Sequence, residues 1–126
     1  LGVLLLDSNA QTHFSFTNAL GVLAAQELHA AERVMAAWPD ARWLVCLHHH
    51  LVEYPRAGVT LADRIATALT NGHWVQSRLA RQAGRVVVLH GHRHTDWAGS
   101  AAGLRILSAP SPVMGAGHFW VQGFAP

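Results

Sequence analysis

The chain has 126 residues, enough for one domain but short of the length expected for two. All nine basic residues are scattered arginines and the net charge is only +2, so no basic patch for nucleic acid is expected. No apolar run reaches the ~18 residues that span a bilayer, and the single cysteine, Cys46, fits a reducing compartment, so the sequence predicts a cytoplasmic protein without a membrane segment.

Three continuous apolar runs predict buried β-strands. Each run is short and is bounded by turn residues or histidines, a pattern typical of strands covered on both faces. The predicted strands are Gly2 to Asp7, Trp43 to Leu47 and Arg85 to His90.

Apolar residues at three-to-four spacing predict three helices, over residues 24–38, 60–70 and 73–82. We expect Pro39 to end the first helix and Gly84 to end the third as a C′ glycine. The expected inner face of the first helix comprises Leu28, Ala31, Val34, Met35 and Trp38.

The C-terminal part has a different pattern. Short apolar segments over Thr95 to Ala98, Leu104 to Ser108 and His118 to Phe124 are separated by a glycine-rich turn, residues 99–103, and a proline-rich one. These segments predict a β-meander. Together with the alternating strands and helices before them, they predict a layered α/β domain with a mixed sheet.

Histidines follow two of the predicted strands. His48 comes directly after Leu47, whereas His92 and His94 follow His90 through Gly91, which we expect to let the backbone turn tightly. Ligands of layered α/β folds lie beyond the carboxyl ends of the strands. If the two strands are neighbours, these three imidazoles converge at one edge, where neutral imidazole suits Mn, Fe or Zn. The sequence therefore predicts a metal site formed by His48, His92 and His94.

Both histidine motifs resemble a known family. Leu47-His48-His49-His50 and Leu89-His90-Gly91-His92-Arg93-His94 resemble the last two motifs of the calcineurin-like metallophosphoesterases. Further segments resemble the same family in order and spacing: Leu6-Asp7-Ser8-Asn9, Gly21-Val22-Leu23, Gln26-Glu27-Leu28 and the run from Gly103 to Pro112. The sequence departs from the family's usual His-His-Pro at Leu51.

The resemblance implies a phosphatase or phosphodiesterase within the family's α/β sandwich. It implies that His48 and His92 bind one metal ion and that His94 binds a second. It also implies hydrolysis of a phosphate mono- or diester by metal-activated hydroxide. The family's Asp-x-His, Gly-Asp-x-x-Asp and Gly-Asn-His motifs do not occur in the sequence. We therefore expect residues 1–126 to be the C-terminal half of such a domain, with the N-terminal half missing or supplied by another chain.

The remaining polar groups near these motifs have supporting roles in this interpretation. His49, His50, His90 and Tyr54 are expected to line the substrate pocket or to orient the ligands, and Arg93 is expected to form a salt bridge or lie at the surface. Without the acidic motifs, three imidazoles would hold one ion well, so the isolated chain is expected to be inactive or weakly active. Two alternatives remain open: a non-catalytic module that binds metal or a partner, and a fragment that folds only on its missing half.

Overall fold

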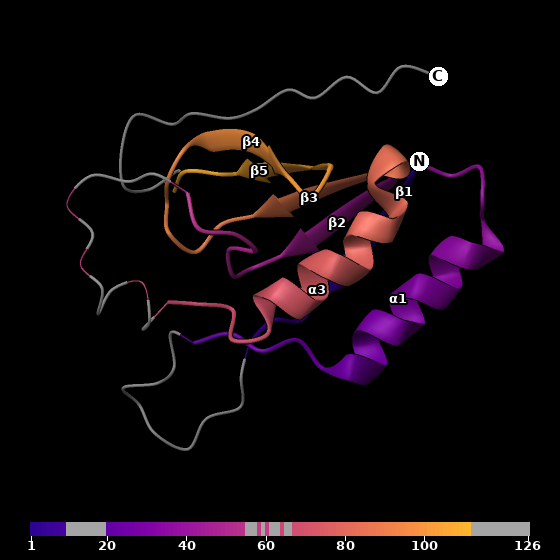
Figure 1. Ribbon diagram of the computed structural model, residues 1–126, viewed down its shortest axis with the longest axis horizontal. Coiled ribbons are helices and arrows are strands. Elements are labelled where there is room, and N and C mark those ends of the chain that lie inside the picture. Colours follow the sequence, from indigo (N-terminus) through magenta and orange to yellow (C-terminus); the bar gives the residue numbers. More distant parts are fainter. Residues whose placement is uncertain (10–19, 55–57, 59, 61–63, 65–66, 112–126) are drawn as a thin grey trace.

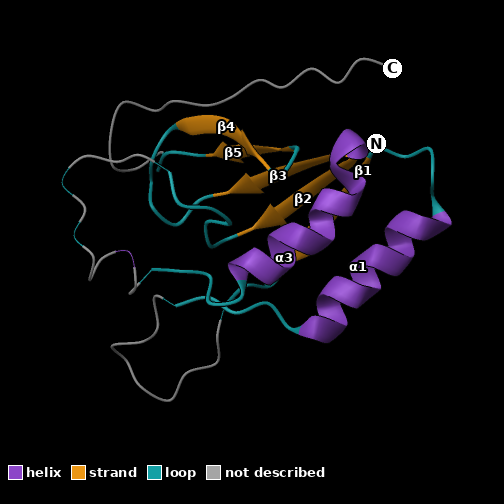
Figure 2. Ribbon diagram, viewed as in Figure 1, coloured by secondary structure: helices purple, strands orange, loops and turns teal. Residues whose placement is uncertain are grey.

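The computed structural model describes residues 1–9, 20–54, 58, 60, 64 and 67–111. These residues form a five-stranded mixed sheet in the order β1-β2-β3-β5-β4, with both helices on one side of it (Figures 1 and 2). The predicted layered α/β class with a mixed sheet is confirmed.

Three of the strands match the predicted apolar runs. The parallel strands β1 (Gly2–Leu6), β2 (Trp43–Leu47) and β3 (Val86–His90) lie side by side. β5 (Leu104–Ser108) pairs parallel with β3, and β4 (Trp97–Ala101) pairs antiparallel with β5 at the edge. Each run folds as a strand because β-branched and other apolar side chains pack well on a pleated, buried surface.

Two regions differ from the predicted C-terminal meander. Gly99 to Ala101, expected in a turn, belong to β4, because the connection to β5 needs only Ala102 and Gly103. Both of these residues have positive φ, 49° and 78°, as the two central positions of a tight hairpin turn require. The expected strand over His118 to Phe124 lies outside the described residues.

The first and third predicted helices are present. α1 spans Ala25–Ala37, and α3 spans Gly72–Leu79 and continues as the 3₁₀ helix η2 (Ala80–Arg85). Gly84 is therefore inside the last turn and does not have positive φ, so its expected role as a left-handed cap is wrong. The buried face of this helix is narrower than expected, since Val34 is 41% exposed and Trp38, which follows the last residue of α1, is 66% exposed.

The predicted helix over 60–70 is wrong at its C-terminal end. Leu69 forms a β-bridge with Gly21, and hydrogen bonds join Gly21 N to Ala68 O and Thr70 N to Gly21 O. These bonds pair the backbone groups with a distant segment and leave no helical turn there. Residues 61–63 and 65–66 of this predicted helix lie outside the described residues.

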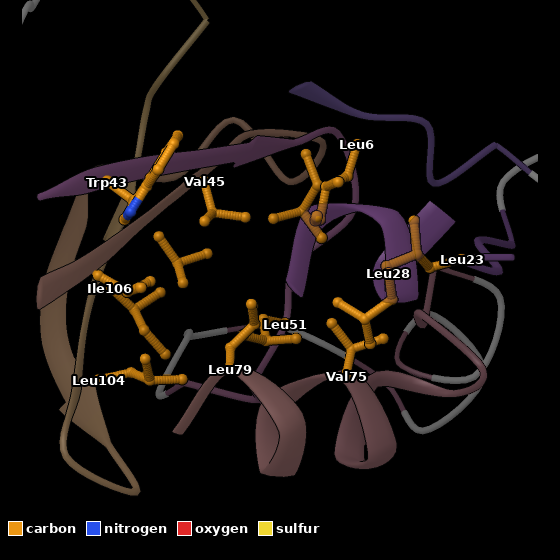
Figure 3. Packing of buried hydrophobic residues seen from close by; sticks show 14 of the residues in the cluster. Leu6, Leu23, Leu28, Trp43, Val45, Leu51, Val75, Leu79, Leu104 and Ile106 are labelled. Carbon is orange, nitrogen blue, oxygen red and sulfur yellow. The ribbon is translucent and has the colours of Figure 1, made fainter. Parts of the chain in front are cut away.

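The hydrophobic core lies between the sheet and the two helices. Figure 3 shows Val45 and Ile106 of the strands facing Val75 and Leu79 of α3. All four are fully buried, and burial of each such side chain contributes about 1.5–3 kcal/mol. This packing fixes the strands, and so fixes the positions of the loops that follow them.

Candidate metal centre

Three parallel strands end level with one another at the edge of the sheet that carries the histidines. In the register of the sheet, Leu6 of β1 pairs with Leu47 of β2, and Leu47 pairs with His90 of β3. The segments after these residues therefore leave the sheet at the same height. The Gly91 N–H donates to the His48 carbonyl at 3.2 Å, which joins the loops after β2 and β3 directly.

Three histidines from these loops form a cluster. His48 and His92 have ring centroids 4.7 Å apart, and His92 Nδ1 lies 2.8 Å from His48 Nε2. The His49 ring lies 5.0 Å from that of His48 and 4.5 Å from that of His92. His48 and His92, which the sequence placed together, are in contact, and the structure adds His49 to them.

These three residues could hold a metal ion. One ring nitrogen from each lies within 4.8 Å of the other two. Nitrogen ligands bind ions such as Zn²⁺ at about 2.0–2.1 Å, so two ligands on opposite sides are about 4.2 Å apart. Small side-chain movements therefore suffice for all three to bind one ion. An ion bound to both His48 Nε2 and His92 Nδ1 would replace the proton that these atoms share.

The side chain of Ser8, two residues beyond β1, forms hydrogen bonds with the segment that carries His48 and His49. Its fully buried hydroxyl oxygen accepts the backbone N–H groups of His48 at 3.2 Å and His49 at 3.1 Å, and it lies 2.9 Å from His49 Nδ1. Because two donors fill its two lone pairs, the hydroxyl proton is left to donate to Nδ1. In the metal-free protein this places the His49 proton on Nε2. His49 must change tautomer to bind an ion through Nε2, whereas one of the nitrogens shared by His48 and His92 is already unprotonated.

Close packing also fixes His49 on its other side. A Cβ atom added to Gly21 would lie 2.5 Å from Cγ of the His49 ring. Only glycine leaves room for the imidazole at this position. The resemblance to the family drew attention to both Ser8 and Gly21, but nothing in the sequence linked either residue to His49.

His94 is separate from this cluster. It is exposed, and among the described residues the group that could hold an ion comprises only His48, His49 and His92. In this loop the residues with positive φ are the two histidines, with φ 65° at His92 and 50° at His94. Gly91 has no positive φ. The expected tight turn begins at Gly91, since the Arg93 N–H donates to the Gly91 carbonyl, but the positive φ that it needs falls on His92. A role for His94 in binding a second ion stays a prediction.

Arg93 and His50 meet at Glu53, beside the cluster. The side chain of Arg93 is 2% exposed and forms an ion pair with Glu53, so it is buried and does not lie at the surface. His50 Nε2 lies 3.1 Å from Glu53 Oε1. Arg93 holds the pKa of the Glu53 carboxyl below its usual range, whereas burial, with Arg93 nearby, lowers the pKa of His50. Both shifts favour an ionised Glu53 next to a neutral His50.

His90 and Tyr54 lie deeper, under the loops. The Tyr54 ring stacks on Trp97 at 4.8 Å and lies 6.0 Å from the His90 ring, and its hydroxyl is 3.2 Å from Ser108 Oγ. Burial lowers the pKa of His90 to about 4, which the Gly91 backbone offsets only in part. His90 is thus neutral at pH 7. Tyr54 and His90 are buried, and their rings lie 6.4 and 6.5 Å from that of His50, beside the cluster.

Comparisons with known proteins do not assign this chain to a family. No family model matches the chain, and a search of curated proteins gave no match. The resemblance to the calcineurin-like metallophosphoesterases therefore depends on the quoted motifs. Within the described residues, no helix has the length and apolar character needed to cross a membrane.

Proposed function

We propose that this chain contributes the histidine half of a metal-dependent phosphoesterase site. The observation that carries the proposal is the convergence of His48, His49 and His92 at the carboxyl edge of parallel strands, within 4.8 Å of one another. This is the edge at which layered α/β domains bind their ligands. The motifs around these histidines are those that resemble the metallophosphoesterases.

The residues present suit a divalent ion that accepts imidazole, such as Mn, Fe or Zn. A bound ion would supply Lewis acidity, which lowers the pKa of a water and neutralises charge on a phosphoryl group. His48 and His92 would hold the ion, and Ser8 would keep the backbone of the His48–His49 turn in place. In this proposal the chain is half of a sandwich, and the N-terminal half, from the same or another polypeptide, supplies the carboxylates.

A second candidate function is a metal-binding module without catalysis. It is favoured by the composition of the cluster, which contains no carboxylate among the described residues. Neutral imidazoles do not offset the charge of two cations close together, so a single ion is expected here. One ion held by three histidines can still activate water, so measured turnover separates the two candidates.

The test is turnover of p-nitrophenyl phosphate and bis(p-nitrophenyl) phosphate by the chain loaded with Mn²⁺ or Zn²⁺. The variants are His48→Ala, His49→Ala and His92→Ala, with His29→Ala, an exposed histidine on α1, as the matched control. We expect slow hydrolysis that His48→Ala and His92→Ala abolish and His29→Ala leaves unchanged. His49→Ala should weaken metal binding less than His92→Ala does, because His49 must first change tautomer. Bound metal without hydrolysis would refute catalysis by these histidines alone and favour the metal-binding module for this chain. Bound metal without hydrolysis in a complex that also supplies the carboxylates would refute the phosphoesterase.

A further inference from the structure

All three guanidinium nitrogens of Arg93 are hydrogen-bonded to neighbouring side chains. Its two terminal nitrogens donate to the two carboxylate oxygens of Glu53, both at 2.9 Å. Nε and Nη2 also donate to Thr67 Oγ1 at 3.2 Å. A guanidinium presents its donors in a rigid plane, so these bonds fix the orientation of the side chain as well as its position.

The backbone on either side of Arg93 is also held. Its N–H donates to the Gly91 carbonyl at 2.8 Å, and its own carbonyl accepts the Thr95 hydroxyl at 3.0 Å. The first bond closes a three-residue γ-turn with His92 at its centre, at φ 65°. A γ-turn with positive φ at its central residue is rare and strained, and it persists only where the surroundings hold it.

Glu53 connects this loop to the other histidine segment. Besides Arg93, it contacts His50 Nε2 at 3.1 Å, and His50 belongs to the turn that begins with His48. The Arg93–Glu53 pair thus joins the segment that carries His48 to the segment that carries His92. Glu53 itself is 49% exposed, so the buried partner that fixes the geometry is Arg93.

We propose that Arg93 is a positioning residue for the metal centre. Through Glu53 and Thr67 it holds His92 in the positive-φ conformation of the γ-turn, with His92 Nδ1 2.8 Å from His48 Nε2. The guanidinium itself contacts Glu53 and Thr67, so Arg93 affects the metal centre through the position of His92. The inference rests on the proposed metal site but does not depend on hydrolysis of phosphate esters.

The variants separate positioning from general stability. Arg93→Gln and Glu53→Gln break the pair, and Arg93→Lys keeps the charge without the planar fork. Glu32→Gln is the matched control, because Glu32 accepts two bonds from Arg78 in a partly buried ion pair between α1 and α3. Each variant is measured for its urea midpoint, for the nuclear Overhauser contact between the His48 and His92 rings without metal, and for Co²⁺ affinity.

We expect Arg93→Gln and Glu53→Gln to lose the ring contact and to bind Co²⁺ about 10–100-fold more weakly, as for other residues that orient metal ligands. Arg93→Lys should fall between these variants and the wild type. Glu32→Gln should lower the urea midpoint yet keep the contact and the affinity. A ring contact retained in Arg93→Gln, or one absent from the wild type, would overturn the inference. If the wild type shows the ring contact but binds no Co²⁺, the metal site is refuted. In that case, loss of the contact in Arg93→Gln would still show that Arg93 positions His92.

Discussion

Replacing Ser8 with alanine removes the hydroxyl that supports the His48–His49 turn. This hydroxyl makes three hydrogen bonds: two accepted from backbone N–H groups, and one to His49 Nδ1. Ser8 is fully buried, so the three groups lose their partner without gaining bulk water. At about 1 kcal/mol for each lost bond, the free energy of unfolding should fall by about 3 kcal/mol.

The assay is urea denaturation of the metal-free protein, followed by tryptophan fluorescence. With a urea dependence of about 1–3 kcal/mol/M, the midpoint should drop by about 1–3 M at unchanged slope. Ser77→Ala is the control, because the exposed Ser77 hydroxyl makes a single local bond, to the Trp74 carbonyl, and should cost less than about 0.5 kcal/mol. A loss below about 1 kcal/mol in Ser8→Ala would refute the assignment of the three bonds.

Two further changes test other parts of the structure. The Arg85 guanidinium donates to four carbonyls at or beyond the C-terminal end of α1, so Arg85→Met should cost about 2 kcal/mol and speed amide exchange in the last turn of α1. Arg81→Met, at an exposed position of η2, should change neither, and an equal loss in both variants would contradict the role of Arg85. The pKa of His90 falls from 6.5 to about 4 on folding, so between these pH values the unfolded chain binds a proton that the folded chain does not. The free energy of unfolding should therefore fall by about 3 kcal/mol as the pH decreases across that window, and His90→Gln should remove this part of the pH dependence. Identical pH profiles for the two proteins would show that His90 is not buried in its neutral form.

The sequence predicted the part of the fold that depends on local pattern. β2 matches its apolar run residue for residue, since such a run has little alternative to a buried strand. The prediction of a helix over 60–70 was wrong at its C-terminal end because Leu69 pairs with Gly21, 48 positions away. No local sequence pattern indicates such a distant partner. Long-range pairing overrides helix propensity wherever both segments gain backbone bonds.

The candidate site, like the fold, could be predicted only where it depends on the local sequence pattern. His48 and His92 each follow a predicted strand, so the sequence predicted that their side chains lie close together if the two strands are neighbours. The inclusion of His49 could not be foreseen, because it depends on Ser8 and Gly21 packing around its ring. The sequence predicted that Arg93 would form a salt bridge or lie at the surface, but it could not identify Glu53 as the partner. That partner depends on the γ-turn at His92 and on the loop after His50, which bring the two side chains together.

The parallel pairing of β1, β2 and β3 also has a consequence for the order of folding. The β4–β5 hairpin closes through two residues, whereas β1 and β2, and β2 and β3, are each separated by more than 30 residues of chain. Contacts between distant segments form slowly, because a long loop loses entropy before any pairing compensates for it. The hairpin should thus form early and the histidine cluster last, after β2 and β3 have paired. Substitutions in the cluster should then change the rate of unfolding and leave the rate of folding almost unchanged.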